Sequence, residues 1–588
     1  MICADDKELS VIRAFQRPPI LLLLAFILGV SGVHAQTNAP GIFFLDLHAG
    51  PNVGGQNNQG VFLTIFGNGF GATQGTSTVT IGGGAVASCP IWGAAWLWYQ
   101  KITCQIGSSA ATGTVVVTVG GRASTCENAD TNENCNFTVQ SGNIYFVSTS
   151  GNDSNPGTFT APFATIPHCY NAMQGGDTCY IENGVVANTV NGHNGCVDAT
   201  NSNGSSGHFV SLIAYPGAIA QLGGPNSPCQ YAIRTPAISG DTAYSYTTLS
   251  QLTLVGAGGS LNQAVNLVDA HNWRLVGNDI SCNGNVGGEA ACWETSSGFA
   301  FTYGYGNHIH NVPSHNKTYH MVYFSSSADH IWMAWNSIHD GGCRGIQTNS
   351  TGSASMFDIH VHDNTIYNIQ CNAINLNTVD PSKGTVEAYN NVVYHAGIGP
   401  DPPDGASDYT CLAVPGDTQS GSPGTGTVLV YNNTIYDCSG GTGTNSGEAG
   451  FFDIGSQGSG PTSVSIVNNV LVSVSADAGS YFSSGSSKGT ISVSGNNNLC
   501  SGSYGNCPSQ LSTSAVNASP GFVSAGSNFH LLSASSPANG AGTGSGSSYF
   551  DHDGLIRPNP PAAGGYEFTS ATTVQRPNPP ANLTAVVQ

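Results

Sequence analysis

An asparagine recurs through the middle of this chain at a nearly regular spacing, and no other feature restricts the fold as strongly. Each is followed two residues later by an aliphatic residue. The series is Asn278, Asn307, Asn336, Asn364, Asn391, Asn433 and Asn469, with steps of 29, 29, 28, 27, 42 and 36 residues. Gln251 precedes it by 27 residues and Asn497 follows it by 28. Such a period predicts stacked repeats that bury their apolar faces against one another.

Each repeat also holds a short segment that reads as a β-strand. These segments are residues 321–324, 345–348, 373–376, 411–414 and 451–454. Alternation along a strand directs Val322, Ile346, Ile374 and Leu412 inward, and Tyr323, Gln347, Asn375 and Asp453 outward. We find no helix-period segments in the repeats, so the pattern predicts a right-handed parallel β-helix. Asparagines stacked at its turns are expected to form a ladder of side-chain amides.

The part of the chain before the repeats has a different pattern. Residues 61–70, 79–82 and 113–120 alternate apolar and polar side chains between glycine turns, which predicts a small Ig-like β-sandwich. Charged residues make up only 8% of the chain, and there are 78 glycines. This composition suits an all-β secreted protein that is rich in turns. The predicted fold class is therefore all-β, a β-sandwich followed by a right-handed parallel β-helix.

Several segments resemble known families. Residues 144–158, 161–166 and 176–180 are similar to the first coil of bacterial right-handed β-helix proteins of the pectate-lyase-like superfamily, and residues 529–537, 551–558 and 564–567 resemble their C-terminal end. The N-terminal module resembles an IPT/TIG domain. The expected organisation is a signal peptide at 1–35, the IPT/TIG-like module at 36–140, the β-helix at 141–570 and a proline-rich tail at 571–588. The superfamily resemblance implies the fold but not one activity, because this fold carries many functions.

The chain is expected to be exported and to contain disulfides. A basic start, a short apolar run and a small residue at Ala35 are typical of a signal peptide, and no later segment is apolar enough to span a membrane. The net charge of −20 argues against a nucleic-acid partner. Cys3 would leave with the signal, and the other 16 cysteines mostly fall in neighbouring pairs. The suggested pairs are Cys89/Cys104, Cys126/Cys135, Cys169/Cys179, Cys196/Cys229, Cys282/Cys292, Cys343/Cys371, Cys411/Cys438 and Cys500/Cys507.

The candidate catalytic residues come from two successive repeats. Eight of the 17 histidines lie between His308 and His362, in a window that also holds two of the chain's 13 lysines and arginines. Stacking is expected to place His320 beside Arg344, near Lys317 and Tyr323. Arg344 can neutralise a sugar carboxylate. Lys317, His320 or Tyr323 can transfer the proton in a β-elimination.

Other polar residues are candidates for binding. Gln347 and Asn375 are expected to project from the same sheet as Tyr323. His310 and His339 occupy equivalent positions on adjacent coils and are candidate substrate-binding residues, although Tyr367, Tyr394 and Tyr436 at the same position also fit simple packing. The longer connections 281–297, 311–319 and 395–410 are expected to wall a groove.

A metal site is a second hypothesis. His360 and His362 should both face outward from one strand, with Glu387 next to His360 on the following coil, and two imidazoles with a carboxylate can bind a transition metal. A surface strand without metal is the plainer interpretation. Calcium is a further possibility without a clear site, so the cofactor is not defined by the sequence.

The favoured function is a secreted or cell-surface polysaccharide lyase that cleaves an acidic, uronate-containing polysaccharide by β-elimination. Lys317 and Arg344 resemble, in residue type only, the pair in chondroitinase-B-like and alginate-lyase β-helices. A glycoside hydrolase is an alternative, with carboxylates such as Asp404 and Asp408 available. A non-catalytic adhesin or glycan-binding protein is another. The sequence does not define the polysaccharide or the oligomeric state.

Overall fold

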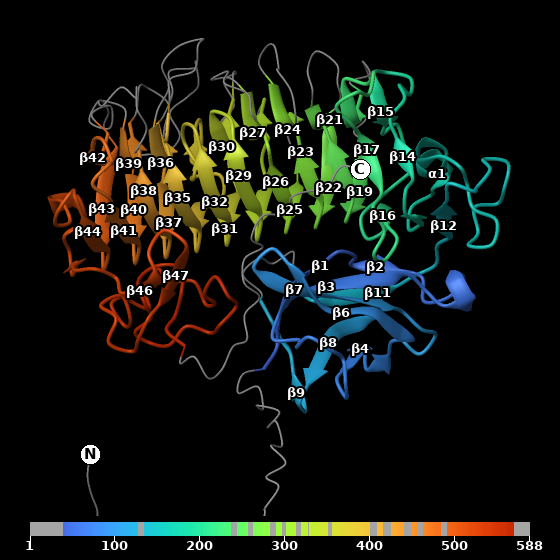
Figure 1. Ribbon diagram of the computed structural model, residues 1–588, viewed down its shortest axis with the longest axis horizontal. Coiled ribbons are helices and arrows are strands. Elements are labelled where there is room, and N and C mark those ends of the chain that lie inside the picture. The colour runs from blue at the N-terminus through green and yellow to red at the C-terminus, as the bar shows by residue number, and fades with distance from the viewer. Residues whose placement is uncertain are drawn as a thin grey trace, which may run out of the picture. The chain divides into compact units, whose positions relative to one another are not determined.

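Three parallel sheets run through the larger part of the chain, because most coils add one strand to each sheet (Figure 1). The structure is a computed structural model. It describes residues 39–127, 134–201, 203–236, 244–256, 263–282, 290–296, 301–312, 319–326, 328–350, 356–399, 409–415, 425–439, 449–455, 463–483 and 491–569. The coils form the predicted right-handed parallel β-helix, and they follow an antiparallel β-sandwich.

Each sheet of the β-helix is named here after its first strand. The β12 sheet contains β12 (Ile144–Val147), β13 (Thr178–Ile181), β16 (Val210–Ala214), β19 (Tyr244–Ser250), β22 (Ala270–Val276), β25 (Thr302–Tyr305), β28 (Ile331–Ala334), β31 (Ile359–His362), β34 (Val386–Tyr389), β37 (Thr427–Tyr431), β40 (Ser463–Val467) and β43 (Ser492–Asn496). The β14 sheet contains β14 (Val186–Ala187), β17 (Gln221–Gly223), β20 (Thr253–Val255), β23 (Asp279–Ser281), β26 (His308–His310), β29 (Ser337–Gly341), β32 (Thr365–Ile369), β35 (Val392–Ala396), β38 (Thr434–Cys438), β41 (Val470–Ser473), β44 (Leu499–Gly502) and β45 (Val516–Asn517). The β15 sheet contains β15 (Gly195–Asp198), β18 (Tyr231–Thr235), β21 (Gln263–Val268), β24 (Ala290–Ser296), β27 (Tyr319–Ser325), β30 (Arg344–Asn349), β33 (Ile374–Leu376), β36 (Tyr409–Val414), β39 (Ala449–Ile454) and β42 (Ser480–Phe482).

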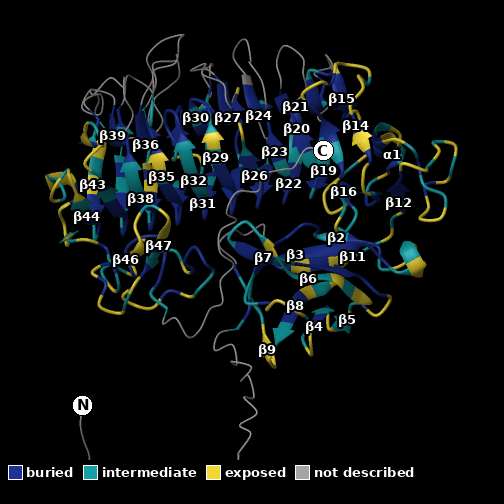
Figure 2. Cartoon of the chain, viewed as in Figure 1, coloured by how far each residue is buried: buried dark blue, intermediate teal, exposed yellow. Residues whose placement is uncertain are grey.

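The interior of the coils is apolar, as the alternation predicts. Val322 pairs with Ile346 and Ile346 with Ile374, and all three side chains are buried. Equivalent residues from the other two sheets complete one continuous core. Figure 2 shows buried strands along the length of the β-helix. The inward and outward assignments made from the sequence are therefore confirmed for these strands.

A ladder of buried asparagines lies at the turn between the β12 and β14 sheets. Each ladder amide donates to the carboxamide oxygen of the next, over 2.9–3.1 Å. Its members are Asn278, Asn307, Asn336, Asn364, Asn391, Asn433, Asn469 and Asn498. Each is almost completely buried. The predicted amide ladder is thus confirmed.

The two ends of the ladder differ from the prediction by one residue. Asn498, not Asn497, accepts from the amide of Asn469. At the other end, Leu252 donates its backbone N–H to Asn278, whereas the Gln251 side chain bonds to Thr64. Gln251 and Asn497 instead occupy the left-handed turn position just before the ladder, with φ of 55° and 53°. Asparagine tolerates that conformation, so the two adjacent turn positions look alike in sequence.

The β-sandwich consists of two sheets. One contains β10 (Thr125–Cys126), β1 (Gly41–Leu45), β3 (Phe62–Asn68), β7 (Tyr99–Gln105) and β6 (Ser88–Trp96). The other contains β2 (Ala49–Gly50), β11 (Asn136–Val139), β8 (Gly113–Val119), β4 (Thr78–Ile81) and β5 (Gly84–Ala85), with β9 (Arg122–Ala123) beside β8. A short 3-10 helix, η1 (Gln56–Asn58), lies between β2 and β3.

Contacts between the sandwich and the β12 sheet are buried. Arg274 on β22 donates to the carbonyl oxygens of Asp46 and Leu45, over 2.7 and 2.9 Å. The Tyr99 hydroxyl donates to the carbonyl of Trp335 over 3.0 Å, within a cluster of aromatic side chains from both parts. This packing removes part of the outer face of the β12 sheet from solvent.

One helix lies before the asparagine repeats, beside the first coil. The helix α1 (Ile166–Ala172) begins after Thr165, whose hydroxyl accepts the backbone N–H of His168, and has a proline in its first turn. Both are established signals of a helix start. The apolar side of α1 packs against the first coil and contributes Ile166, Cys169 and Tyr170 to the core.

The parallel coils end at β45, near the 3-10 helix η4 (Ser509–Leu511). The chain then forms the antiparallel pair β46 (Phe522–Ser524) and β47 (Asn528–Leu531). Phe529 contacts the rings of Tyr394 and Tyr436, so this pair covers part of the β14 sheet.

All eight suggested disulfides are present, from Cys89–Cys104 to Cys500–Cys507. They are consistent with an extracellular protein, because disulfides persist in oxidising environments. The expected signal peptide and the tail from residue 570 lie outside the described residues. Within the described ranges, no helix has the length and apolar character needed to cross a membrane.

The ladder yields a test of stability. Asn336 donates to Gly304 and Asn364, and its oxygen accepts two bonds from Asn307. Asn336→Ala leaves buried partners unsatisfied, and we expect a loss of about 2–4 kcal/mol in the free energy of unfolding, measured by denaturant titration. The exposed Asn188→Ala control should change it by no more than about 0.5 kcal/mol. Equal effects of the two variants would contradict a structural role for the ladder.

Candidate functional site

A row of side chains, all but one of them polar or charged, follows the outer face of the β15 sheet. Strand register aligns its members across successive coils: Asp198, Arg234, Asn266, Glu294, Tyr323, Gln347, Asn375, Ala413 and Asp453. The strand pairing therefore brings Tyr323, Gln347 and Asn375 onto one face, as expected from the sequence.

His320 and Arg344 are paired residues on β27 and β30, as the repeat predicted. The His320 ring is almost fully buried and meets the Tyr323 ring edge to face, with centroids 4.9 Å apart. Burial, and secondarily the Arg344 guanidinium, hold the pKa of His320 well below its usual range. His320 is therefore a neutral imidazole near pH 7, and its Nδ1 has no hydrogen-bond partner among the residues that the structure describes.

Arg344 and Tyr323 are partly exposed, whereas the predicted binding residues beside them are not. Gln347 and Asn375 are buried, and the Asn375 amide donates to the Gln347 oxygen over 3.5 Å. The Arg344 Nε donates to Asn372 over 3.3 Å, and Asn372 in turn donates to Thr410. These bonds orient the guanidinium on the sheet surface. Lys317 lies outside the described residues, so its place beside this pair stays a prediction.

Glu294 belongs to the same face but was missed in the sequence. It is next to Tyr323 in the row and accepts from the Gln263 amide over 2.9 Å. Burial raises the pKa of its carboxyl. The sequence predicts a connection over residues 281–297, whereas residues 290–296 form β24. The 29-residue step from Trp293 to Val322 was the signal that identifies this strand.

His310 and His339 are paired, but on the β14 sheet and not on the face that carries His320. The His339 ring stacks on Tyr367 with centroids 4.5 Å apart. The His339 Nδ1 lies 2.8 Å from Asp340, and its Nε2 lies 2.8 Å from His308. Their proposed role in binding substrate stays a prediction, and their immediate partners are other histidines and carboxylates.

The residues of the second hypothesis, on the β12 sheet, divide into two environments. His360 pairs with Glu387, lies 2.6 Å from its carboxylate and 3.1 Å from Asp358, and stacks on Trp332. His362 is fully buried, lies 2.9 Å from Asp363 and stacks on Tyr389. In the described part of the chain, converging metal-ligand atoms are found at Asp279, His308 and His310, not in this set.

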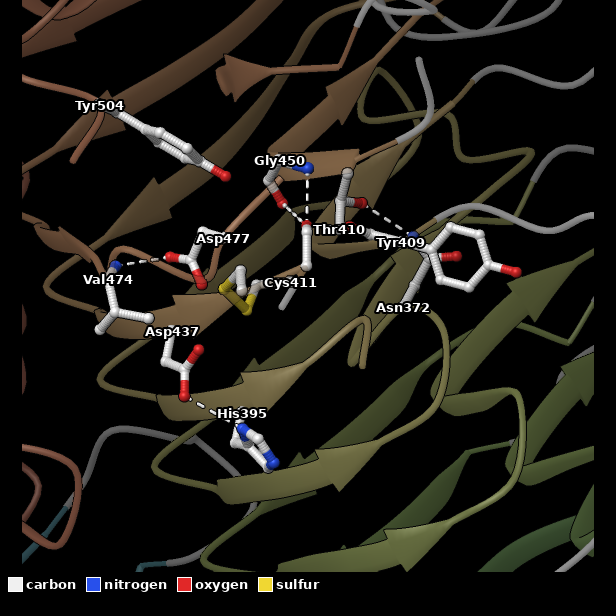
Figure 3. The surroundings of a disulfide bond; sticks show 12 residues. Asn372, His395, Tyr409, Thr410, Cys411, Asp437, Gly450, Val474, Asp477 and Tyr504 are labelled. Atoms are coloured by element: carbon white, nitrogen blue, oxygen red, sulfur yellow. Dashed lines mark hydrogen bonds and ion pairs between the residues drawn. A yellow bond between two sulfur atoms is a disulfide. The ribbon is translucent and has the colours of Figure 1, made fainter. Parts of the chain in front are cut away.

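A pair of carboxyl groups lies near the Cys411–Cys438 disulfide. Figure 3 shows Asp437 and Asp477 pointing toward one another, with His395 3.0 Å from Asp437. Burial and the neighbouring Asp437 raise the pKa of Asp477. Asp404 and Asp408, the carboxylates suggested for hydrolysis, lie outside the described residues.

Comparison with known proteins supports the architecture. Residues 49–157 match the IPT/TIG domain family. No curated protein matches the chain. Together with the sheet topology, the match defines an IPT/TIG domain followed by a right-handed parallel β-helix.

Similar solved structures include three carbohydrate enzymes. The pectate lyase Pel9A is 13% identical, covers 72% of this chain and 96% of its own, and has a TM-score of 0.35. A rhamnogalacturonan lyase is 14% identical, covers 65% and 91%, and scores 0.34. A lacto-N-biosidase from Eubacterium ramulus is 13% identical, covers 64% and 67%, and scores 0.30. Similarity at this level carries no argument about activity.

His360 yields a test of pH dependence. Burial alone would lower its pKa, but hydrogen bonds to Asp358 and Glu387 outweigh it and raise the pKa to about 9. The contribution of the protonated His360 ring to the free energy of unfolding is therefore fully present below its ordinary pKa of about 6.5. This contribution is lost as the pH rises through 9. We expect His360→Gln to lower the free energy of unfolding at pH 6 by on the order of 2 kcal/mol, and less at pH 9.5. Denaturant titrations at several pH values measure this, and a difference independent of pH would contradict it.

Proposed function

We propose that the protein cleaves an acidic, uronate-containing polysaccharide by β-elimination on the outer face of the β15 sheet. One observation carries this proposal: a neutral imidazole, a phenol and a guanidinium lie together on adjacent strands β27 and β30. Those three groups supply charge neutralisation and proton transfer, which are the two requirements of the reaction.

Arg344 provides the positive charge. The chain has 13 lysines and arginines against 33 aspartates and glutamates, so a cation beside Tyr323 and His320 is a specific feature. A guanidinium stays protonated and binds a carboxylate through two parallel N–H groups. In the reaction Arg344 holds the uronate carboxylate and stabilises the negative charge that develops when the neighbouring C–H bond breaks.

Tyr323 and His320 are the groups that transfer the C5 proton of the uronate. Tyr323 is partly exposed and can reach a sugar. His320 is buried against the Tyr323 ring and acts through Tyr323. The C5 proton passes to Tyr323 as the Tyr323 hydroxyl proton passes to the neutral His320, and the C5–H electron pair forms the C4–C5 double bond. The C4–O bond breaks, and the leaving oxygen takes a proton. Glu294 lies next to Tyr323, and its raised pKa suits it to supply that proton.

Carboxylate spacing along the row does not favour hydrolysis. A glycoside hydrolase needs two carboxyl groups about 5–9.5 Å apart. Asp198 is three strands from Glu294 and Asp453 is five, which corresponds to about 14 and 24 Å at the usual strand spacing of about 4.8 Å. Elimination requires no such pair, so it is the better match to this face.

A panel of purified polysaccharides tests the proposal. Products are followed by ultraviolet absorbance, which reports the new double bond, and by reducing ends. We expect both signals on a uronate polymer, and a loss of at least about 100-fold in kcat/KM for Arg344→Ala, the scale of removing one transition-state donor. Arg344→Lys should retain part of the activity because it keeps the charge.

Arg234→Ala is the matched control, because Arg234 lies on the same sheet four strands away and donates to the carbonyl of His193. It should keep wild-type activity. Reducing ends without absorbance would show a hydrolase, and retention of a glycan without new ends would show a binding protein. Either result, or full activity of Arg344→Ala, would overturn the proposal.

A further inference from the structure

Three ligand groups converge on the outer face of the β14 sheet, away from the proposed catalytic face. Asp279 on β23 pairs with His308 on β26, and His310 leaves the same strand two residues later. The Asp279 carboxylate lies 3.1 Å from the His308 Nδ1 and 3.1 Å from the His310 Nε2. One ligand atom from each residue lies within 4.8 Å of the other two. All three side chains are partly exposed, so solvent ions reach them.

These distances suit a shared ion. Nitrogen and oxygen ligands bind Zn²⁺ at about 2.0–2.2 Å, which places two ligands on one ion about 3–3.5 Å apart. The distances of 3.1 Å from Asp279 to His308 and to His310 fall in that range. The strand register holds the residues in place, because His308 and His310 project to the same side and Asp279 occupies the neighbouring rung.

A count of hydrogens also indicates a cation. Three successive contacts of histidine ring nitrogens join Asp279 to His308, His308 to His339 and His339 to Asp340, over 3.1, 2.8 and 2.8 Å. Each contact needs one hydrogen between two acceptor atoms, which makes three. Two neutral imidazoles carry only two. The third position is filled by a proton on one ring or by a metal ion between Asp279 and His308.

We propose that Asp279, His308 and His310 bind a divalent transition-metal ion, with Zn²⁺ as the first candidate. Two imidazoles and one carboxylate are the ligands of zinc, iron, nickel and copper sites, whereas Ca²⁺ takes six to eight oxygens. The ion joins two consecutive coils through β23 and β26. Three protein ligands leave further coordination positions for water or a ligand.

His339 and Asp340 are positioning residues for this site. With His308 bound through Nδ1, its Nε2–H donates to the His339 Nε2, and the His339 Nδ1–H donates to Asp340. The Asn368 amide holds the other oxygen of Asp340 over 2.8 Å. Such outer partners fix the tautomer and orientation of a liganding histidine. This inference does not depend on the proposed lyase activity.

Metal titration of the full chain tests the proposal. The protein is treated with chelator, and Zn²⁺ binding is measured by calorimetry and by the shift in Tm on adding the ion. We expect the wild-type protein to bind one equivalent of Zn²⁺. The His310→Gln and Asp279→Asn variants should lose this binding or bind Zn²⁺ at least about tenfold more weakly. His395→Ala, an exposed histidine on the same sheet, is the control and should keep that equivalent. Circular dichroism of each variant without metal shows whether the fold is retained.

Co²⁺ provides a second readout that a folding defect does not imitate. The absorption of bound Co²⁺ reports its ligands, so His339→Gln should shift the spectrum and weaken binding about 10- to 100-fold without abolishing it. Wild-type protein that binds no Zn²⁺, or His310→Gln and Asp279→Asn variants that bind it as tightly as the wild type, would overturn the proposal. A Co²⁺ spectrum unchanged by His339→Gln would refute the role of His339.

Discussion

The amide ladder between the β12 and β14 sheets is the interaction on which the rest of this β-helix depends. Each ladder asparagine from Asn278 to Asn469 uses both its donors and its oxygen: it binds the next amide, a strand carbonyl and a backbone N–H in the turn. A buried polar group without those partners would cost about 1–3 kcal/mol, so the turn has little freedom to shift. Fixed turns keep successive coils in register, and register decides which distant residues become neighbours.

Both proposed sites follow from that register. His320 and Arg344 are 24 residues apart in sequence and adjacent in the β15 sheet. Asp279 and His308 are 29 residues apart and adjacent in the β14 sheet. The two sets therefore lie on different sheets of the same coils, with one suited to an acidic sugar and the other to a metal ion. The β12 sheet serves a third purpose, because its outer face packs against the sandwich.

The cysteine pairs followed from their proximity along the chain. The repeat was sufficient to predict most strands of the coils, their inward faces and the juxtapositions of His320 with Arg344 and of His360 with Glu387. These depend only on period and alternation, which are local. The prediction failed where packing between distant segments decides. The sequence shows that His362 leaves its strand on the outer side, but not that Trp335 and Tyr389 bury it. Glu294 was missed because the variable spacing of turns made β24 look like a loop.

The most direct test of the central claim is a crystal structure of the Tyr323→Phe variant bound to a uronate oligosaccharide, because this variant keeps Arg344 but lacks the hydroxyl that transfers the proton. The account predicts that the sugar chain lies across β24, β27 and β30, with one uronate carboxylate bound to Arg344 and its C5–H facing the ring of residue 323. A sugar chain bound on the β14 or β12 sheet, with the β15 sheet empty, would contradict the account.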